Sequence, residues 1–232
     1  QAEAEVLNRG FLMRMRRQRP FITLKLAASL DGRTAMASGE SQWITGAAAR
    51  ADVHRLRAEA GAVRGSSATV LADNPALTVR EFMAADLRQP DRIVLDSQRR
   101  VPATAAVWSA GARRFWLGAS APASRPSEVE ALTVETTAEG TISLPRALAA
   151  LAAQQVNAVL VECGPRLAGA LLAERLVDEL VLYLAPSLLG GEARGLAALP
   201  ALTRLSDRVQ LQYRDVRRVG EDLRITATLK DH

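Results

Sequence analysis

Alternating apolar and polar residues predict a β-strand near the start of the chain. In FITLKLAA (21–28), Ile22, Leu24 and Leu26 share one face of that strand, and Lys25 lies on the other. Further short apolar runs predict strands over 61–64, 92–96, 114–117, 132–135, 156–162 and 179–184. We therefore expect a sheet that most of the chain helps to build.

Segments with helical spacing of apolar residues separate these strands. They cover 47–59, 69–72, 144–154 and 164–173, and Thr45 is predicted to cap the first of them. Strands that alternate with helices pair in parallel, whereas the last two runs, 209–217 and 223–229, predict an antiparallel hairpin. The sequence thus predicts an α/β sandwich with a mostly parallel central sheet and a C-terminal antiparallel hairpin.

The 232 residues suit one domain after a short N-terminal segment. Residues 1–19 carry apolar residues at helical spacing and then a cluster of arginines, which Pro20 ends. We assign 1–19 to an N-terminal helix and linker and 20–232 to the main domain. A solvated connector explains this basic segment better than a phosphate-binding role does.

The amino-acid composition excludes several classes of protein. Lys and Arg number 30 against 25 Asp and Glu, a net charge of +5 with both signs mixed, which suits anionic ligands but not a nucleic-acid-binding stripe. The single cysteine, Cys163, excludes an internal disulfide and a cysteine-based zinc site. No apolar run reaches the roughly 20 residues that span a bilayer. We expect no metal, no membrane association, and a solvated His54.

The segment after the 156–162 strand is a candidate nucleotide site. Glu162 ends the strand, and Gly164 and Pro165 open a helix that is rich in small residues. A helix N-terminus at the carboxyl end of a parallel strand offers N–H groups and partial positive charge to a pyrophosphate. A glycine after a strand is more often simply a turn, and this segment lacks the G-x-G-x-x-G fingerprint.

Lys25 is a candidate functional residue because only one other lysine, Lys230, occurs in the chain. Apolar residues flank Lys25, so a buried ammonium would need a carboxylate or a ligand beside it. Glu162, at the end of its own strand, could share a crevice with Lys25. The alternative is a lysine on an edge strand that reaches solvent.

Two weaker constellations involve arginines. Ser41, Arg57 and Arg80 could clamp a phosphate monoester, although a pair of arginines in an arginine-rich chain usually lies on the surface. Ser97, followed by Arg99 and Arg100, could accept the 2′-phosphate of a dinucleotide. Trp43, in a polar loop, is either a platform for a flat ligand ring or a core anchor.

Taken together, long blocks of the sequence resemble a known family. They are LKLAASLDGRTAMASGESQWIT (24–45), ADVHRLRAEAGAV (51–63), SSATVLADNPALTVR (66–80), RIVLDSQRRV (92–101) and VECGPRLAGALLAERLVDELVLYLAPSLLGGEARGL (161–196). This chain resembles the reductase half of the bifunctional riboflavin-biosynthesis deaminase–reductase of proteobacterial type. The resemblance runs from about residue 8 to the C-terminus, and the segment 7–20 is similar to the junction after the deaminase half.

The resemblance implies a dihydrofolate-reductase-like three-layer sandwich and NADPH-dependent reduction of 5-amino-6-(5-phosphoribosylamino)uracil to its ribitylamino product. It makes Lys25, Glu162 and Asp73 the catalytic residues. It assigns substrate contacts to Ser41, Arg57, Leu77, Arg80 and Glu162. It assigns cofactor contacts to Ala27, Trp43, Thr69, Asp73, Ser97, Gly164, Pro165, Arg166, Leu167, Ala168, Gly169 and Ala170.

The resemblance also sets expectations about partners. The zinc-binding H-x-E and P-C-x-x-C motifs of the deaminase half do not occur here, so we expect no deaminase activity and a deaminase domain that could precede Gln1. We expect a cytoplasmic homodimer that acts on a small phosphorylated molecule. Departures from the family pattern are Ser66 and Ala68 for glycines, Asn74 for Asp, and a short 81–89 loop. The alternatives are a reductase of another small substrate and a non-catalytic nucleotide-binding module.

Overall fold

The structure, a computed structural model, describes residues 2–80 and 87–230. The chain forms two compact units that each combine two stretches of sequence. The first unit comprises Gln1–Ile22 and Leu56–Val161, and the second comprises Thr23–Arg55 and Glu162–His232. Six residues of the short 81–89 loop, 81–86, lie outside the described residues. The boundary that we predict between residues 19 and 20 stays a prediction.

The first unit is built on parallel strands in the order β7-β3-β4-β5-β6. Their bounds are β3 (Ala62–Ser66), β4 (Asp91–Leu95), β5 (Arg114–Gly118), β6 (Val129–Thr133) and β7 (Ala158–Glu162). Residues of β3, β4 and β5 are almost all buried, and they include Arg64, Arg92 and Arg114 as well as the apolar side chains. All strands point the same way, so their carboxyl ends share one edge of this sheet.

The helices of the first unit are α1 (Ala2–Leu7), α2 (Arg9–Arg17), α4 (Ser67–Asp73) and α5 (Leu144–Ala153), with a 3-10 turn η1 (Ala106–Trp108). Helix α2 contacts the residues just before β7, where Arg14 Nε donates to Asn157 Oδ1 at 2.6 Å. Gly10 is buried there, and a Cβ on it would lie 3.0 Å from the Asn157 carbonyl oxygen. The basic N-terminal segment is therefore helical and packed on one side.

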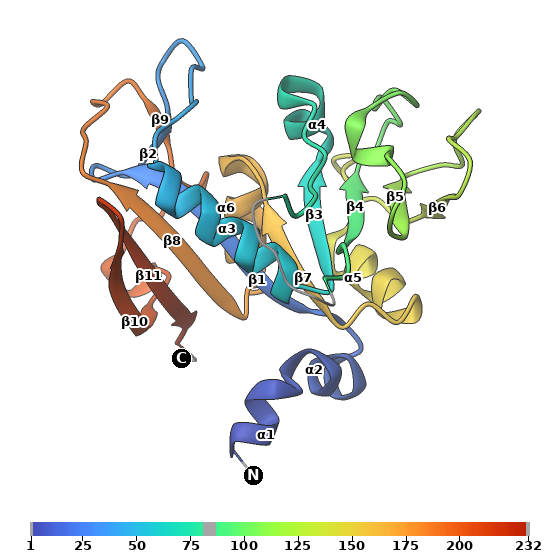
Figure 1. Cartoon of the computed structure of the whole chain (residues 1–232), viewed down its shortest axis with the longest axis horizontal. Coiled ribbons are helices and arrows are strands. Elements are labelled where there is room, and N and C mark those ends of the chain that lie inside the picture. Colours follow the sequence, from blue (N-terminus) through green and yellow to red (C-terminus); the bar gives the residue numbers. More distant parts are fainter. Residues whose placement is uncertain (1, 81–86, 231–232) are drawn as a thin grey trace. The chain divides into compact units, whose positions relative to one another are not determined.

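In the second unit the strand order is β10-β11-β8-β1 (Figure 1). Strands β1 (Phe21–Ser29) and β8 (Glu179–Ala185) are parallel, whereas β11 (Asp222–Leu229) is antiparallel to both β8 and β10 (Leu211–Val219). The helices are α3 (Ala47–Glu59), whose last four residues belong to the first unit, and α6 (Pro165–Ala173), with a 3-10 turn η2 (Leu205–Asp207). A small antiparallel pair joins β2 (Arg33–Ala35) to β9 (Arg194–Gly195).

The predicted α/β class, the mostly parallel strands and the C-terminal hairpin are confirmed. Three details differ. Strand β6 starts three residues earlier than predicted because it pairs with the full length of β5. Gly46, not Thr45, caps α3: its carbonyl accepts from the Arg50 N–H, and its own N–H is held by Asp222. His54 is buried, contrary to the solvated side chain that we expected.

Asp31 ties together the loops that follow β1 and β8. Its carboxylate accepts from the Ser29 hydroxyl and from the N–H groups of Leu189 and Gly190. These bonds, that of Ser29 foremost, lower the pKa of Asp31 from 3.8 to about 2. A carboxyl whose pKa is lower in the folded state stabilises the fold above its unfolded pKa, and this contribution is lost as pH falls through the folded value.

We therefore predict that Asp31→Asn lowers the Tm at pH 6, because the amide carries no charge and has one acceptor oxygen where the carboxylate uses two. The Tm difference between variant and parent should shrink as pH falls from about 4 to about 2, the range between the unfolded and the folded pKa of the parent carboxyl. Thermal melts of both proteins between pH 2 and 7 measure it. A Tm difference that stays constant over that range would contradict the assignment.

Candidate functional site

Lys25 lies on the middle of β1, on the face that is only partly buried, opposite Ile22, Leu24 and Leu26 on the buried face. This alternation is the one predicted from the sequence. In the register with β8, Lys25 is paired with Val181, and Ala27 with Tyr183. The Lys25 Nζ lies 5.9 Å from the centroid of the Tyr183 ring. The ammonium is therefore placed over an aromatic face.

Glu162 and the start of α6 belong to the same unit as Lys25. Glu162 is the last residue of β7 and is partly exposed. Gly164 is the N-cap of α6, and Pro165 occupies its first turn. A proline at that position is compatible with the helix because the first N–H groups have no partner within it. A Cβ built on Gly164 meets nothing within 4 Å, so the space beside this helix N-terminus is open.

Further along α6, the small residues pack against the backbone near Ala198, whereas the space beside Gly164 is open. A Cβ on Gly169 would lie 2.1 Å from the carbonyl oxygen of Ala198, and the Ala198 N–H donates to the Pro165 carbonyl at 2.9 Å. Ala168 and Gly169 are both buried. The space that the absence of a side chain leaves at Gly169 is thus filled by the backbone of Ala198. The predicted cofactor role of these two residues stays a prediction.

The loop between β2 and α3 carries Ser41 and Trp43, and both are exposed. The Arg50 guanidinium lies 4.7 Å from the centroid of the Trp43 ring, and its Nη1 donates to the Thr45 carbonyl at 2.7 Å. Trp43 is 69% exposed, so it is not the core anchor that was one of its two interpretations. Arg50 covers one face of the indole in a cation–π contact.

In the first unit, Thr69 and Asp73 lie on α4. The Ser66 side chain caps this helix by accepting from the Thr69 N–H at 3.2 Å, and the two hydroxyl oxygens are 3.0 Å apart. Ser66, a departure from the family pattern, therefore serves as an N-cap. Asp73 is exposed at the end of the helix, and Asn74 follows it in a left-handed conformation.

Arg57, Leu77 and Arg80 are the predicted substrate residues of the first unit. Arg57 Nη1 donates to the Thr78 carbonyl at 3.1 Å, which ties the end of α3 to the segment after α4. Leu77 is buried and packs near Gly65, where a Cβ would lie 3.2 Å from Leu77 Cδ1. Arg80 is exposed. The structure thus brings Arg57 and the 77–78 segment together.

Ser97 follows β4 and is partly exposed, and Asp96 beside it is buried. The Asp96 carboxylate accepts from the Val101 N–H at 2.8 Å and from Trp116 Nε1 at 3.3 Å, so it holds its own loop. Arg99 donates to the carbonyls of Ser120, Trp116 and Leu132, and burial lowers its pKa. Of the two predicted arginines, Arg99 is thus engaged with the backbone.

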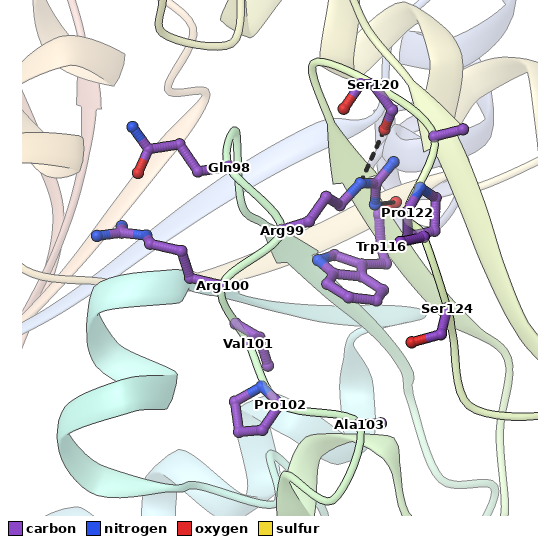
Figure 2. A pocket seen from close by; sticks show the side chains of 12 residues that line it. Gln98, Arg99, Arg100, Val101, Pro102, Ala103, Trp116, Ser120, Pro122 and Ser124 are labelled. Carbon is purple, nitrogen blue, oxygen red and sulfur yellow. Dashed lines mark hydrogen bonds between the residues drawn. The ribbon is translucent and has the colours of Figure 1, made fainter.

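A polar cavity of about 470 Å³ lies in the first unit beside these loops, after the carboxyl ends of β4 and β5. Figure 2 shows Arg99 above the Trp116 indole and bonded to Ser120, whereas Arg100 points away from Trp116. The Arg100 side chain is 55% exposed, and its Nη2 donates to Ser67 Oγ at 3.4 Å. Arg100 is thus the more exposed of the two arginines that line this cavity, and its Nε lies 4.0 Å from Asp96 Oδ1.

Comparison with known proteins decides the family. The family model of the RibD C-terminal domain matches residues 20–225. The chain belongs to this family. The riboflavin biosynthesis protein RibD of Escherichia coli K12 is 50% identical over 235 residues, which cover 96% of this chain and 63% of that protein. This RibD C-terminal domain thus spans less than two thirds of the length of that relative.

Solved structures agree with this assignment. RibD of Acinetobacter baumannii matches with a TM-score of 0.86 at 37% identity, covering 98% of this RibD C-terminal domain and 63% of that chain. A diaminohydroxyphosphoribosylaminopyrimidine deaminase/5-amino-6-(5-phosphoribosylamino)uracil reductase of Thermotoga maritima matches with a TM-score of 0.84 at 26% identity, covering 99% and 62%. Dihydrofolate reductase of Enterococcus faecalis shares the fold alone, with a TM-score of 0.50 at 12% identity over 91% of this chain and 97% of that one.

The described part of this RibD C-terminal domain has neither a membrane-spanning helix nor a metal-binding cluster of side chains. None of its helices combines the length and the apolarity that crossing a bilayer requires. Within residues 2–80 and 87–230, no three His, Cys, Asp or Glu side chains gather in a way that could hold a metal ion.

The predicted site residues of this RibD C-terminal domain are divided between its units. The second unit holds Ala27, Ser41, Trp43, Lys25, Glu162 and 164–170; the first holds Arg57, Thr69, Asp73, Leu77, Arg80 and Ser97. Sequence reasoning missed Arg50, Asp52 and Tyr183, which contact or surround predicted residues. A tyrosine on an apolar strand beside the predicted lysine strand is the one signal that could have drawn attention to Tyr183.

Proposed function

We propose that this chain reduces 5-amino-6-(5-phosphoribosylamino)uracil to the ribitylamino compound with NADPH, in riboflavin biosynthesis. The observation that carries this proposal is the match of the RibD C-terminal domain model over residues 20–225. The name of the Thermotoga maritima relative includes this reductase activity, and that relative's fold covers 99% of this chain. Retention of Lys25, Glu162 and Asp73 supports a catalytic chain over a non-catalytic binding module.

The start of α6 has the features that a dinucleotide requires. The N–H groups of Arg166 and Leu167 have no acceptor within the helix, and the space next to Gly164 is open. A pyrophosphate would be stabilised there by these donors and by the positive end of the helix dipole. The proposed cofactor residues therefore fit an anionic dinucleotide. When bound, NADPH supplies the hydride that reduces the sugar C1.

The chain's own residues would prepare the substrate. Opening of the glycosylamine to an imine needs a proton at the ribose ring oxygen, and the imine carbon accepts hydride more readily when its nitrogen is protonated. Lys25 and Glu162 are the proposed residues that handle these protons. Arg57 and Arg80 are proposed to bind the 5′-phosphate, and this remote binding orients C1. Asp73 is proposed to accept from the nicotinamide carboxamide.

The direct test is to mix the purified chain with the ribosylamino substrate, made enzymatically, and with NADPH. We expect loss of the reduced-cofactor absorbance at the rate at which the ribitylamino product forms. NADPH binding with no turnover would instead support the non-catalytic module. Oxidation of NADPH with a pterin or another carbonyl compound, but not with this substrate, would support a different reductase.

We also infer a preference for NADPH over NADH, from Ser97 and Arg100. Arg100 is exposed next to the polar cavity of the first unit, so its guanidinium is available to a 2′-phosphate. We predict that Arg100→Ala raises the KM for NADPH about tenfold, the loss of one charged hydrogen bond, and leaves the KM for NADH unchanged. Initial rates with the two dinucleotides measure this. An equal rise for both would remove Arg100 from phosphate recognition.

The homodimer is proposed from the edge strand β10. Leu211, Tyr213 and Val216 on this strand are large apolar side chains, and they are 37%, 69% and 53% exposed. An edge strand with exposed apolar side chains is a surface that a second copy of the chain can cover. Sedimentation velocity should give twice the mass of one chain, and a single-chain mass at micromolar concentration would contradict the dimer. A preceding deaminase domain and a cytoplasmic location are proposed from the family alone.

A further inference from the structure

A buried cluster of charges surrounds the phenol of Tyr183 in the second unit. Tyr183 is 0% exposed, and its hydroxyl donates to Asp52 Oδ2 at 2.6 Å. The same oxygen accepts from Arg224 Nη1 at 2.9 Å, and Arg55 Nη2 lies 3.0 Å from Asp52 Oδ1. One carboxylate on α3 therefore holds a residue of β8 and a residue of β11. The far end of the Tyr183 side chain is fixed.

The strand register places the ring of Tyr183 next to Lys25. Across β1, β8 and β11, one row consists of Ala27, Tyr183 and Arg224. Lys25 is two residues before Ala27 on the same strand, so it projects from the same face of the sheet. It is a diagonal neighbour of Tyr183, and its Nζ lies 5.9 Å from the ring centroid.

The Tyr183 ring can bind the Lys25 ammonium electrostatically. The face of an aromatic ring is the negative end of its quadrupole, so it attracts a cation within about 6 Å. Burial, reinforced by the bond to Asp52, raises the pKa of Tyr183, so the phenol stays protonated and keeps its hydrogen bond. The ring adds no charge and no titratable step beside Lys25. It offers a rigid surface whose position α3 controls.

We propose that Tyr183 is a positioning residue for Lys25: its ring, held in place by burial and fixed further by the bond of its hydroxyl to Asp52, restricts where the Lys25 ammonium can lie. The role of Lys25 in the reaction rests on the proposed function, but its placement by Tyr183 does not.

Because the chain has only two lysines, nuclear magnetic resonance can observe the placement directly. Protein labelled with ¹³C at the lysine ε-carbon gives two side-chain signals, and Lys25→Met identifies which is which. An ammonium over a ring face places its ε-protons in the shielding region of that ring. We expect the Lys25 signal upfield of the Lys230 signal. Tyr183→Leu should abolish this difference, whereas Tyr183→Phe, which keeps the ring, should preserve it.

The kinetic test uses the same two variants. Tyr183→Leu should lower kcat about 3- to 30-fold, because that factor corresponds to the free energy of a partly buried cation–π contact. The KM values for the substrate and for NADPH should both stay within about twofold of the parent. Tyr183→Phe should restore kcat to within about threefold. Leu180→Ala is the matched control, because the Leu180 side chain is buried on the face of β8 opposite Tyr183, so its loss should reduce stability without changing the Lys25 signal.

The outcomes separate this proposal from the proposed function. An upfield Lys25 signal that Tyr183→Leu removes, in a chain without reductase activity, would support the placement and reject the function. Equal Lys25 and Lys230 signals in the parent would overturn the placement whatever the activity. If Tyr183→Leu does not fold, Tyr183→Phe still decides: a lost upfield shift with the ring present would contradict the proposal.

Discussion

Replacing Lys25 by alanine should lower kcat about 10²- to 10⁴-fold, the usual contribution of a side chain that moves a proton in the transition state. The Kd for NADPH should stay within about threefold of the parent, because a residue that acts only on the reacting sugar adds little to ground-state cofactor binding. Single-turnover rates and a fluorescence titration with NADPH measure the two quantities separately.

Two further variants show whether the expected fall in kcat comes from loss of the Lys25 ammonium. Lys25→Met keeps a long apolar side chain on the face of β1 that lies next to Tyr183 of β8, and it should lose as much kcat as Lys25→Ala if the ammonium is what matters. Lys230→Ala removes the only other lysine, after the end of β11, and should leave both quantities unchanged. Equal losses of kcat and of NADPH affinity in Lys25→Ala would speak against a chemical role.

Arg80→Ala is the second variant with a large expected effect. We expect the KM for the phosphorylated substrate to rise about 10- to 100-fold, because a charged hydrogen bond to a phosphate contributes about 1.5–3 kcal/mol. The KM for NADPH should not change. Initial rates at saturating NADPH, with the substrate varied, measure this effect.

Arg88→Ala is the matched control for Arg80→Ala, since both arginines are exposed and lie on either side of residues 81–86. A general loss of positive charge near this segment would raise the KM in both variants, whereas a specific phosphate contact would raise it only in Arg80→Ala. An unchanged KM in Arg80→Ala would remove Arg80 from the proposed phosphate site.

Much of the fold could be predicted because local patterns determine it. The alternation in 21–28 fixes which face of β1 is buried, and Gly164 with Pro165 marks the start of α6 within one residue. Thr45 shows the limit of such reasoning. Its hydroxyl suits a helix cap, but the cap is Gly46, whose N–H is held by Asp222, 176 residues away in the sequence. A contact between residues so far apart in the sequence does not appear in the local pattern of apolar and polar residues.

In the candidate site, too, local patterns predict some features and contacts between distant segments decide the others. Lys25 and Glu162 could be singled out because a charge in an apolar segment is unusual. The contacts around them could not, because they join distant segments: the Tyr183 hydroxyl reaches Asp52 over 131 residues of sequence. The sequence context of Arg99 likewise suggests a surface arginine, yet Arg99 donates to the carbonyl of Ser120, just after β5, and to that of Leu132, within β6. Such a side chain is recognised only when the strands that it bridges are known.

The packing of Gly169 against Ala198 affects how inherited or engineered changes in this protein are interpreted. Even a methyl group at position 169 overlaps the Ala198 carbonyl, so the backbone near residue 198 must move. That backbone is also bonded to Pro165, in the first turn of the same helix. A change at position 169 would therefore be transmitted along α6 to its first turn through the backbone near Ala198. A screen that records only lost dinucleotide affinity would not separate this packing effect from the loss of a direct contact at Gly169.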